Sequence, residues 1–201
     1  MLTDVRDILR EHGTTYAAEA GITLRDKPAP LFQLLVLCLL FSAPISAGVA
    51  AASARELFRE GWRTPRRMRE GSTWQQRVDA LGRGGYRRYD ESTARYLEQL
   101  CDRLLEDYRG DLRRLRDEAG GDPRLIRRTL QQFDRIGPTG ADIFCREAQA
   151  VWPSLRPYFD RRALEGAKTV GLPADPDELA AQVAPDEVAR LAAALVRVDL
   201  G

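Results

Sequence analysis

The chain has 201 residues, of which 31 are Lys or Arg and 30 are Asp or Glu, so its formal net charge is only +1. A chain of this length can bury a substantial core, either as one domain or as two packed lobes. The near balance of charge excludes a global field that would draw the protein onto nucleic acid, so any such affinity must come from local clusters.

Composition also bears on the compartment and on metal binding. The first 30 residues are charged and amphipathic, unlike a secretory signal. Residues 30–54 carry no charge, but Pro44 and Gly48 interrupt this run, which favours a buried helix pair over a membrane span. The three cysteines lie far apart in sequence on apolar helical faces, and His12 is the only histidine. We therefore expect buried thiols, no metal site and a soluble cytoplasmic protein.

Apolar residues recur at helical spacing through nearly the whole chain, with no convincing alternating strand, so the fold class is expected to be all-α. Helices are expected at residues 4–20, 31–41 and 46–60, in a short segment that begins at Thr64-Pro65, and at 73–81, 91–108 and 111–119. Between two of them, residues 82–90 (GRGGYRRYD) form a glycine-rich loop that is both basic and aromatic.

A helix-turn-helix pattern follows. Asp122-Pro123 has the residues of a helix start, and a tight turn lies at residues 135–140 before the next helix. Such a turn can aim free backbone N–H groups at a phosphate, although Gly and Pro are also common in plain helix-helix turns. The residues assigned to this candidate anion site are Arg135, Ile136, Gly137, Pro138, Thr139 and Gly140. Arg146 either assists them or is simply solvated.

Further on, Asp160 opens a helix that is expected to reach residue 170. Two more helices are expected to begin near Asp175 and Asp186. On spacing alone Asp160 is an ordinary helix cap, since its carboxylate can accept from free N–H groups of the first turn.

Four segments in this order resemble motifs of the helix-hairpin-helix DNA glycosylases of the endonuclease III type. They are LVLCLLFSA at 35–43, GYRRY at 85–89 with the following Ser-Thr-Ala, FDRIGPTGA at 133–141 and FDRR at 159–162. The resemblance covers roughly residues 1–172. It implies a two-lobed helical fold with a DNA-binding cleft between the lobes. The helical barrel would be residues 31–152, with the hairpin at about 124–152, and residues 1–30 and 153–201 would form the second lobe.

The same resemblance assigns roles to individual residues. Asp160 would be the catalytic carboxylate, acting on a base that is flipped out of the duplex. Tyr86, Arg87, Arg88 and Tyr89 would contact or insert into the DNA, or else they form a surface loop over a helix end. Ser42 and Pro44 would lie at the base pocket or fill the vacated stack.

Departures from the family pattern narrow the expected chemistry. Thr139 stands where bifunctional members have a lysine, so no Schiff base and no lysine-dependent lyase activity is expected. Pro44 replaces the stack-filling glutamine, and Arg135 replaces the first hairpin glycine. The iron-sulfur cysteines are missing, so no iron-sulfur cluster or other cofactor is expected.

Two functions fit these observations. The first is a monofunctional DNA glycosylase of base excision repair, which hydrolyses the N-glycosidic bond of a damaged or mispaired base in double-stranded DNA. The second is a non-catalytic helix-hairpin-helix DNA-binding protein that has lost base excision. In either case the expected protein is a monomer at the nucleoid in the cytoplasm, with no membrane partner. A helical protein-interaction domain whose motifs are coincidental is a third interpretation.

Overall fold

The computed structural model describes residues 4–201, and these contain helices and no β-strand. The all-α prediction is therefore confirmed. Contacts divide the chain into two compact units. The central unit is residues 17–144, and the terminal unit combines residues 4–16 with 145–201. The lobes expected from the resemblance, divided after residues 30 and 152, stay a prediction.

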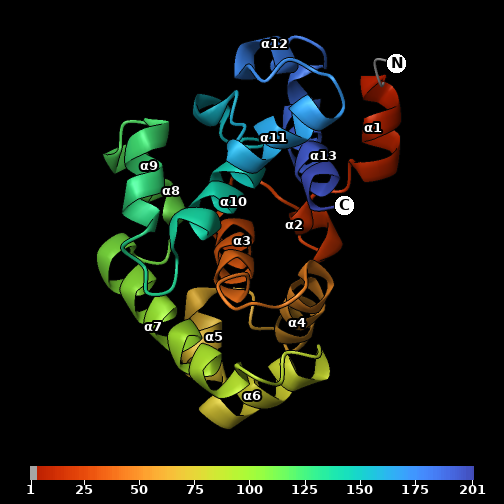
Figure 1. The fold of residues 1–201 in the computed structure, drawn as a ribbon. Coiled ribbons are helices and arrows are strands. Elements are labelled where there is room, and N and C mark those ends of the chain that lie inside the picture. The colour runs from red at the N-terminus through yellow and green to blue at the C-terminus, as the bar shows by residue number, and fades with distance from the viewer. Residues whose placement is uncertain (1–3) are drawn as a thin grey trace. The chain divides into compact units, whose positions relative to one another are not determined.

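The central unit is built around one helix that is apolar except for Gln33, α3 (Pro28–Leu40). Every residue of α3 from Leu31 to Leu40 is buried except Gln33, as expected for a helix that is hydrophobic on all sides. It contacts α4, α7 and α8 (Figure 1). The helices of this unit after α3 are α4 (Ala47–Arg59), α5 (Pro65–Gly71), α6 (Trp74–Arg83), α7 (Asp90–Tyr108), α8 (Leu112–Glu118) and α9 (Pro123–Leu130).

Local capping explains where several of these helices begin. The Ser46, Thr64 and Thr73 side chains each accept a hydrogen bond from a backbone N–H in the first turn of α4, α5 and α6. Asp122 does the same for α9, with Pro123 in the first helical position. These starts lie within a residue or two of the expected ones, because the caps are local sequence signals.

The terminal unit packs α11 (Arg161–Thr169) and α1 (Val5–His12) against the long last helix, α13 (Val188–Leu200). Its core includes Ile8, Phe159, Ala163 and Leu195. A short helix, α12 (Pro176–Ala180), and a 3₁₀ turn at Pro185–Glu187 precede α13. The close approach of α11 to α13 depends on Gly166, since a Cβ there would lie 1.9 Å from the Leu195 carbonyl oxygen.

One expected helix is wrong in its extent. Residues 4–20 do not form a single helix, because α1 ends at His12 and a separate turn of helix, α2, spans Tyr16–Glu19. Gly13 caps α1 by donating its backbone N–H to the Leu9 carbonyl. A Cβ at Gly13 would lie 2.2 Å from that same oxygen, so the chain turns out of the helix where only glycine fits.

No helix within residues 4–201 is long and apolar enough to cross a membrane. The uncharged run at 30–54 is instead divided between α3 and α4, with a break at residues 41–46. The three cysteines are buried, as expected. Desolvation by burial raises the pKa of the Cys101 thiol to about 12.

Candidate functional site

Two helices and a seven-residue connection form the predicted hairpin. The first helix is α9, and the second, α10, spans Pro138–Ala148. The connection is held from inside by Phe133 and Ile136, which are both buried, and the Ile136 N–H donates to the Phe133 carbonyl at 3.0 Å. A bidentate ion pair from Arg127 on α9 to Asp142 on α10 links the two helices, with a shortest distance of 2.6 Å.

The start of α10 has the features of an anion site. Gly137 and Thr139 are exposed, and the first helical hydrogen bond of the turn runs from the Ala141 N–H to the Gly137 carbonyl at 3.0 Å. The N–H groups of Thr139 and Gly140 lie in the first turn, where a helix has no internal acceptor for them. Pro138, with no N–H, occupies the first helical position. The Thr139 amide and the positive end of the helix dipole therefore lie together at an exposed turn, while Gly140 is buried.

Arg135 has a conformation that suits glycine, the residue that the resemblance expects there. Its φ is +68°, one of only two positive values among the described non-glycine residues. Its guanidinium lies 4.8 Å from the centre of the Tyr96 ring and donates to the Tyr96 hydroxyl at 2.9 Å. The Arg135 side chain is therefore held by stacking on Tyr96 of α7. A glycine at this position would make no such contact.

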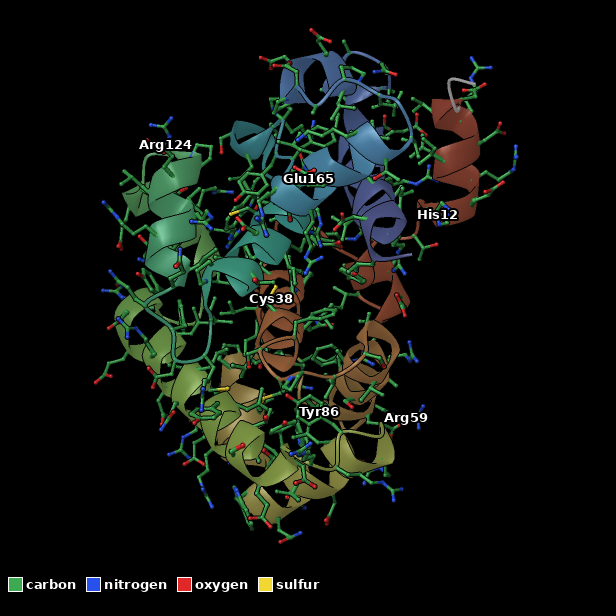
Figure 2. The ribbon with its side chains drawn as sticks, viewed as in Figure 1. His12, Cys38, Arg59, Tyr86, Arg124 and Glu165 are labelled. Carbon is green, nitrogen blue, oxygen red and sulfur yellow. The ribbon has the colours of Figure 1, made fainter. Side chains whose placement is uncertain are left out.

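The loop at residues 82–90 divides into a buried part and an exposed part. Tyr86 is only 1% exposed and lies inside the central unit (Figure 2). Its hydroxyl donates to the Leu40 carbonyl and accepts from the Thr93 hydroxyl, both at 3.2 Å. Burial raises the pKa of this phenol. A DNA-contacting role is therefore wrong for Tyr86, because its ring fills the core and its polar atom is satisfied there.

The rest of the loop is accessible. Arg87 and Arg88 are exposed, and the Arg88 guanidinium lies 5.6 Å from the centre of the half-buried Tyr89 ring. Ser42 and Pro44, the base-pocket candidates, are exposed in the connection between α3 and α4. A DNA contact by any of these five residues stays a prediction.

The predicted segments of the central unit meet at the carboxyl end of α3. Gly140, in the first turn of α10, lies so close to α3 that a Cβ would be 3.5 Å from the Cys38 carbonyl oxygen. Tyr86 binds the Leu40 carbonyl in the same last turn. Gly85 packs on Val49 of α4. The hairpin, the Arg87–Tyr89 segment and the connection bearing Ser42 and Pro44 are thereby gathered around one helix end, and we call this region the α3 end.

In the terminal unit, Asp160 is the N-cap of α11, and both of its carboxylate oxygens are engaged. Oδ1 accepts from the Ala163 N–H at 3.0 Å, and Oδ2 forms an ion pair with Arg146 Nη1. The Asp160 side chain is 7% exposed and that of Arg146 is 2% exposed. The cap and the ion pair together hold this carboxylate in one orientation.

Both interpretations of Arg146 from the sequence are wrong. It is neither solvated nor available to assist at the hairpin, because it is buried in the terminal unit. Its Nε and Nη2 atoms are buried with no hydrogen-bond partner, and its guanidinium lies 5.5 Å from the centre of the Tyr16 ring. The sequence indicates this burial only through the apolar neighbours of Arg146 on α10, Phe144, Cys145 and Ala148, which are all buried. A charge at an inward position needs a partner.

The buried ion pair has polar neighbours along the chain. Glu147 is buried and accepts from the Tyr16 N–H at 3.1 Å. The Gln149 side chain donates to the Tyr158 carbonyl at 2.8 Å and accepts from the Tyr158 N–H at 2.9 Å, which fixes the chain just before Asp160. Gln149 thus orders the segment that leads to Asp160, while Glu147 holds the chain at Tyr16.

The residues present do not fit an iron-sulfur cluster. Such clusters are typically held by four cysteine thiolates, and this chain has three cysteines. They are buried on α3, α7 and α10. Within residues 4–201 no group of three or more His, Cys, Asp or Glu side chains is arranged to hold a metal ion.

The fold that contains the hairpin and the helix capped by Asp160 is similar to that of endonuclease III. One matching solved structure is a trapped endonuclease III–DNA covalent intermediate in an estranged-adenine complex, and another is a non-covalent endonuclease III–DNA complex. Their TM-scores are 0.50 and 0.53, each at 18% sequence identity, covering 98% of this chain and 85% of the other. This likeness establishes the fold. No protein-family model and no curated protein matches the sequence.

Proposed function

We propose that the protein binds double-stranded DNA through the α3 end and that, while Arg146 holds Asp160, it does so without excising a base. The absence of excision is inferred from the Asp160 carboxylate, which is buried, caps α11 and is paired with the Arg146 guanidinium. DNA binding is supported by the exposed hairpin turn at Gly137 and Thr139 and by a fold similar to that of endonuclease III, whose matching structures are DNA complexes.

The ion pair opposes catalysis for an electrostatic reason. A carboxylate that promotes base release must either stabilise positive charge developing on the sugar or accept a proton from water. Arg146 already neutralises Asp160, and the Ala163 N–H occupies the other oxygen. Catalysis would require the carboxylate to leave a buried partner, and a buried charge without its partner is strongly destabilising.

The proposed binding of DNA follows from the local charge and geometry of the α3 end. The net charge of +1 supplies no general attraction to DNA, so affinity would come from the α10 amides and from Arg87 and Arg88. A site of this kind holds phosphates without reading the bases. It is therefore expected to weaken with salt, with a slope set by the few phosphates contacted.

A hydrolytic glycosylase is the second candidate, and the position of Asp160 favours it. This residue caps the helix that follows the hairpin, where the resemblance places the catalytic aspartate. Thr139 replaces the amine nucleophile, so such an enzyme would release the base and leave the strand intact. DNA would then have to displace Arg146 from the carboxylate. In either candidate we propose a monomer that acts on cytoplasmic, nucleoid DNA without a cofactor.

The test has a binding arm and an excision arm. Binding to a short duplex is measured by fluorescence anisotropy at several salt concentrations for the wild type, Gly137→Asp and Ala181→Asp. Ala181 is exposed and is not part of the hairpin, so its variant makes the same charge change outside the hairpin sequence. We expect Gly137→Asp alone to weaken binding, because a carboxylate would face the α10 amides.

The excision arm incubates duplexes carrying oxidised, deaminated, alkylated or mispaired bases, followed by alkali to cleave abasic sites. We expect no abasic sites from the wild type. Base release that disappears in Asp160→Asn would establish the glycosylase instead. Absence of duplex binding at low salt would remove both candidates.

A further inference from the structure

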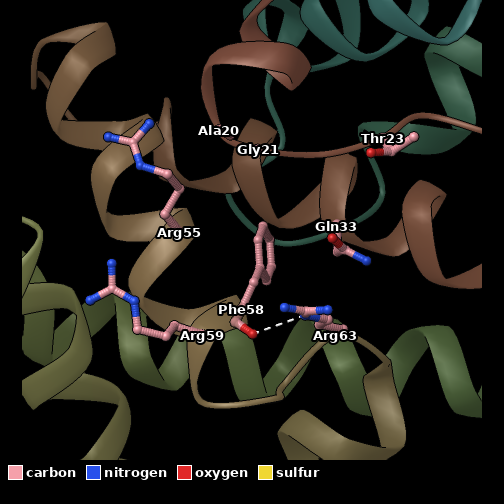
Figure 3. Close-up of a pocket in the computed structure, with 8 residues that line it drawn as sticks. All are labelled: Ala20, Gly21, Thr23, Gln33, Arg55, Phe58, Arg59 and Arg63. Carbon is pink, nitrogen blue, oxygen red and sulfur yellow. Dashed lines mark hydrogen bonds between the residues drawn. The ribbon is translucent and has the colours of Figure 1, made fainter.

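A second basic feature of the central unit lies away from the hairpin. Where the turn after α2, the first half of α3 and the end of α4 meet, a pocket of about 450 Å³ opens to solvent (Figure 3). Three arginines line it, Arg55, Arg59 and Arg63, and no acidic side chain is among the described residues of its lining. The volume falls in the range of small-molecule sites.

Two of these guanidiniums are held in place without being neutralised. Arg55 donates through Nη1 to the Glu19 carbonyl, and Arg63 donates through Nε to the Phe58 carbonyl at 3.0 Å. Carbonyl groups are neutral, so both side chains keep their full charge and their other N–H groups. Within residues 4–201 no ion pair is formed by Arg55 or Arg63, whereas Arg59 pairs with Glu56 at 2.8 Å.

The turn that follows Glu19 lies beside the Arg55 side chain. Gly21 has a φ of +72°, and an added Cβ would lie 3.8 Å from the Arg55 side chain. Glycine suits this left-handed turn at the end of α2, and the Arg55 stem lies at ordinary van der Waals distance from it. In Figure 3 the Phe58 ring stands between Arg55 and Arg59 on one side and Gln33 and Arg63 on the other.

We propose that this pocket binds the phosphate of a nucleotide-sized molecule. Guanidinium groups suit phosphate because their forked N–H groups match pairs of its oxygens. The Gln33 amide and the Thr23 hydroxyl, both in the lining, supply neutral hydrogen-bonding groups for the rest of such a ligand. A free nucleotide and a phosphate of a DNA backbone share this chemistry, and the experiment separates them.

The pocket is separable from the α3 end. It uses Gln33, near the amino end of α3, whereas the hairpin and Tyr86 contact the Cys38 and Leu40 carbonyls in the last turns. A substitution of Arg55 or Arg63 therefore leaves the hairpin contacts intact. Both arginines are exposed, so their replacement is not expected to disturb the core.

The experiment is a calorimetric titration with thymidine monophosphate, inorganic pyrophosphate, thymidine and an undamaged short duplex. The variants are Arg55→Gln/Arg63→Gln and, as control, Arg66→Gln/Arg67→Gln, which removes the same charge from exposed positions on α5. We expect the wild type and the control to bind the phosphorylated probes but not thymidine. The pocket variant is expected to bind them about 10-fold or more weakly, since charge-assisted hydrogen bonds are lost.

Dependence of duplex binding alone on Arg55 and Arg63 would uphold the phosphate site and identify its source as DNA. Equal weakening in both double variants would overturn the proposal, because only general charge would then matter. So would the absence of binding by any phosphate-bearing probe up to about 10 mM. Failure of duplex binding in Gly137→Asp bears on the proposed function and leaves this inference unchanged.

Discussion

Arg146 and Asp160 form an ion pair across 14 residues of sequence, with their side chains only 2% and 7% exposed. The pair joins α10 to the amino end of α11 within the terminal unit. It satisfies one oxygen of the carboxylate but leaves two nitrogens of the guanidinium without acceptors. The same contact that anchors α11 also occupies the one carboxylate with a proposed chemical role.

Removing either partner of this pair is expected to destabilise the protein. Asp160→Asn and Arg146→Met should each lower the free energy of unfolding by about 3–5 kcal/mol, because an uncompensated charge stays buried. The double variant should recover much of that loss. Urea denaturation of the three variants gives the coupling energy. Additive losses would show that the two side chains act independently.

Gly166 allows α11 to approach α13. Gly166→Ala places a Cβ 1.9 Å from the Leu195 carbonyl oxygen, so we expect a loss of at least about 1–3 kcal/mol of unfolding free energy. Gly48→Ala is the matched control, since nothing lies within 4 Å of its added Cβ on α4. That control should gain about 0.5–1 kcal/mol. Thermal denaturation of both variants checks the difference, and equal stabilities would contradict it.

Arg135 combines an unfavourable backbone conformation with a favourable stack on Tyr96. Arg135→Ala keeps the positive φ and loses the stack, whereas Arg135→Gly loses the stack but also relieves the strain. We therefore expect the glycine variant to be more stable than the alanine variant by about 1 kcal/mol. Urea unfolding of the two variants measures this. An alanine variant as stable as the glycine variant would mean that the hairpin relaxes.

Asp111 is expected to make part of the stability pH-dependent. Its side chain caps α8 and pairs with Arg113, whose hydrogen bonds lower the pKa of this carboxyl. Its contribution is therefore present above the unfolded-state pKa of about 4 and is lost as the pH falls through the lower folded-state pKa. Asp111→Asn should be less stable than the wild type at pH 7 by less than about 1 kcal/mol. The gap should close in acid; a constant gap from pH 7 to pH 2 would disprove the linkage.

The cysteines should be unreactive in the folded protein. All three are buried, and burial raises the pKa of the Cys101 thiol to about 12, so almost no thiolate forms at pH 8. An aromatic disulfide reagent should label no cysteine quickly in buffer and all three in guanidinium chloride. Fast labelling of the native protein would show that the helices around α3 open readily.

Much of the hairpin was predictable because its signals are local. Asp122-Pro123 and the turn residues Ile136, Gly137 and Pro138 determine a helix start, a tight turn and a second helix within about 20 residues of chain. The cap at Asp160 is equally local. The break at Gly13 was missed because the apolar periodicity continues past it, and Tyr86 because an aromatic residue between glycine and arginine looks like a surface loop.

The sequence alone determined the all-α class, most helix boundaries, the hairpin and the missing lysine at Thr139, since caps, turns and residue identity need no distant partner. Only the tertiary structure decided that Tyr86 belongs to the core, that Arg55 and Arg63 line one pocket and that Arg146 neutralises Asp160. Each of these depends on residues from different helices meeting in space. The charge state of a buried group is set by those neighbours, which lie far away along the chain.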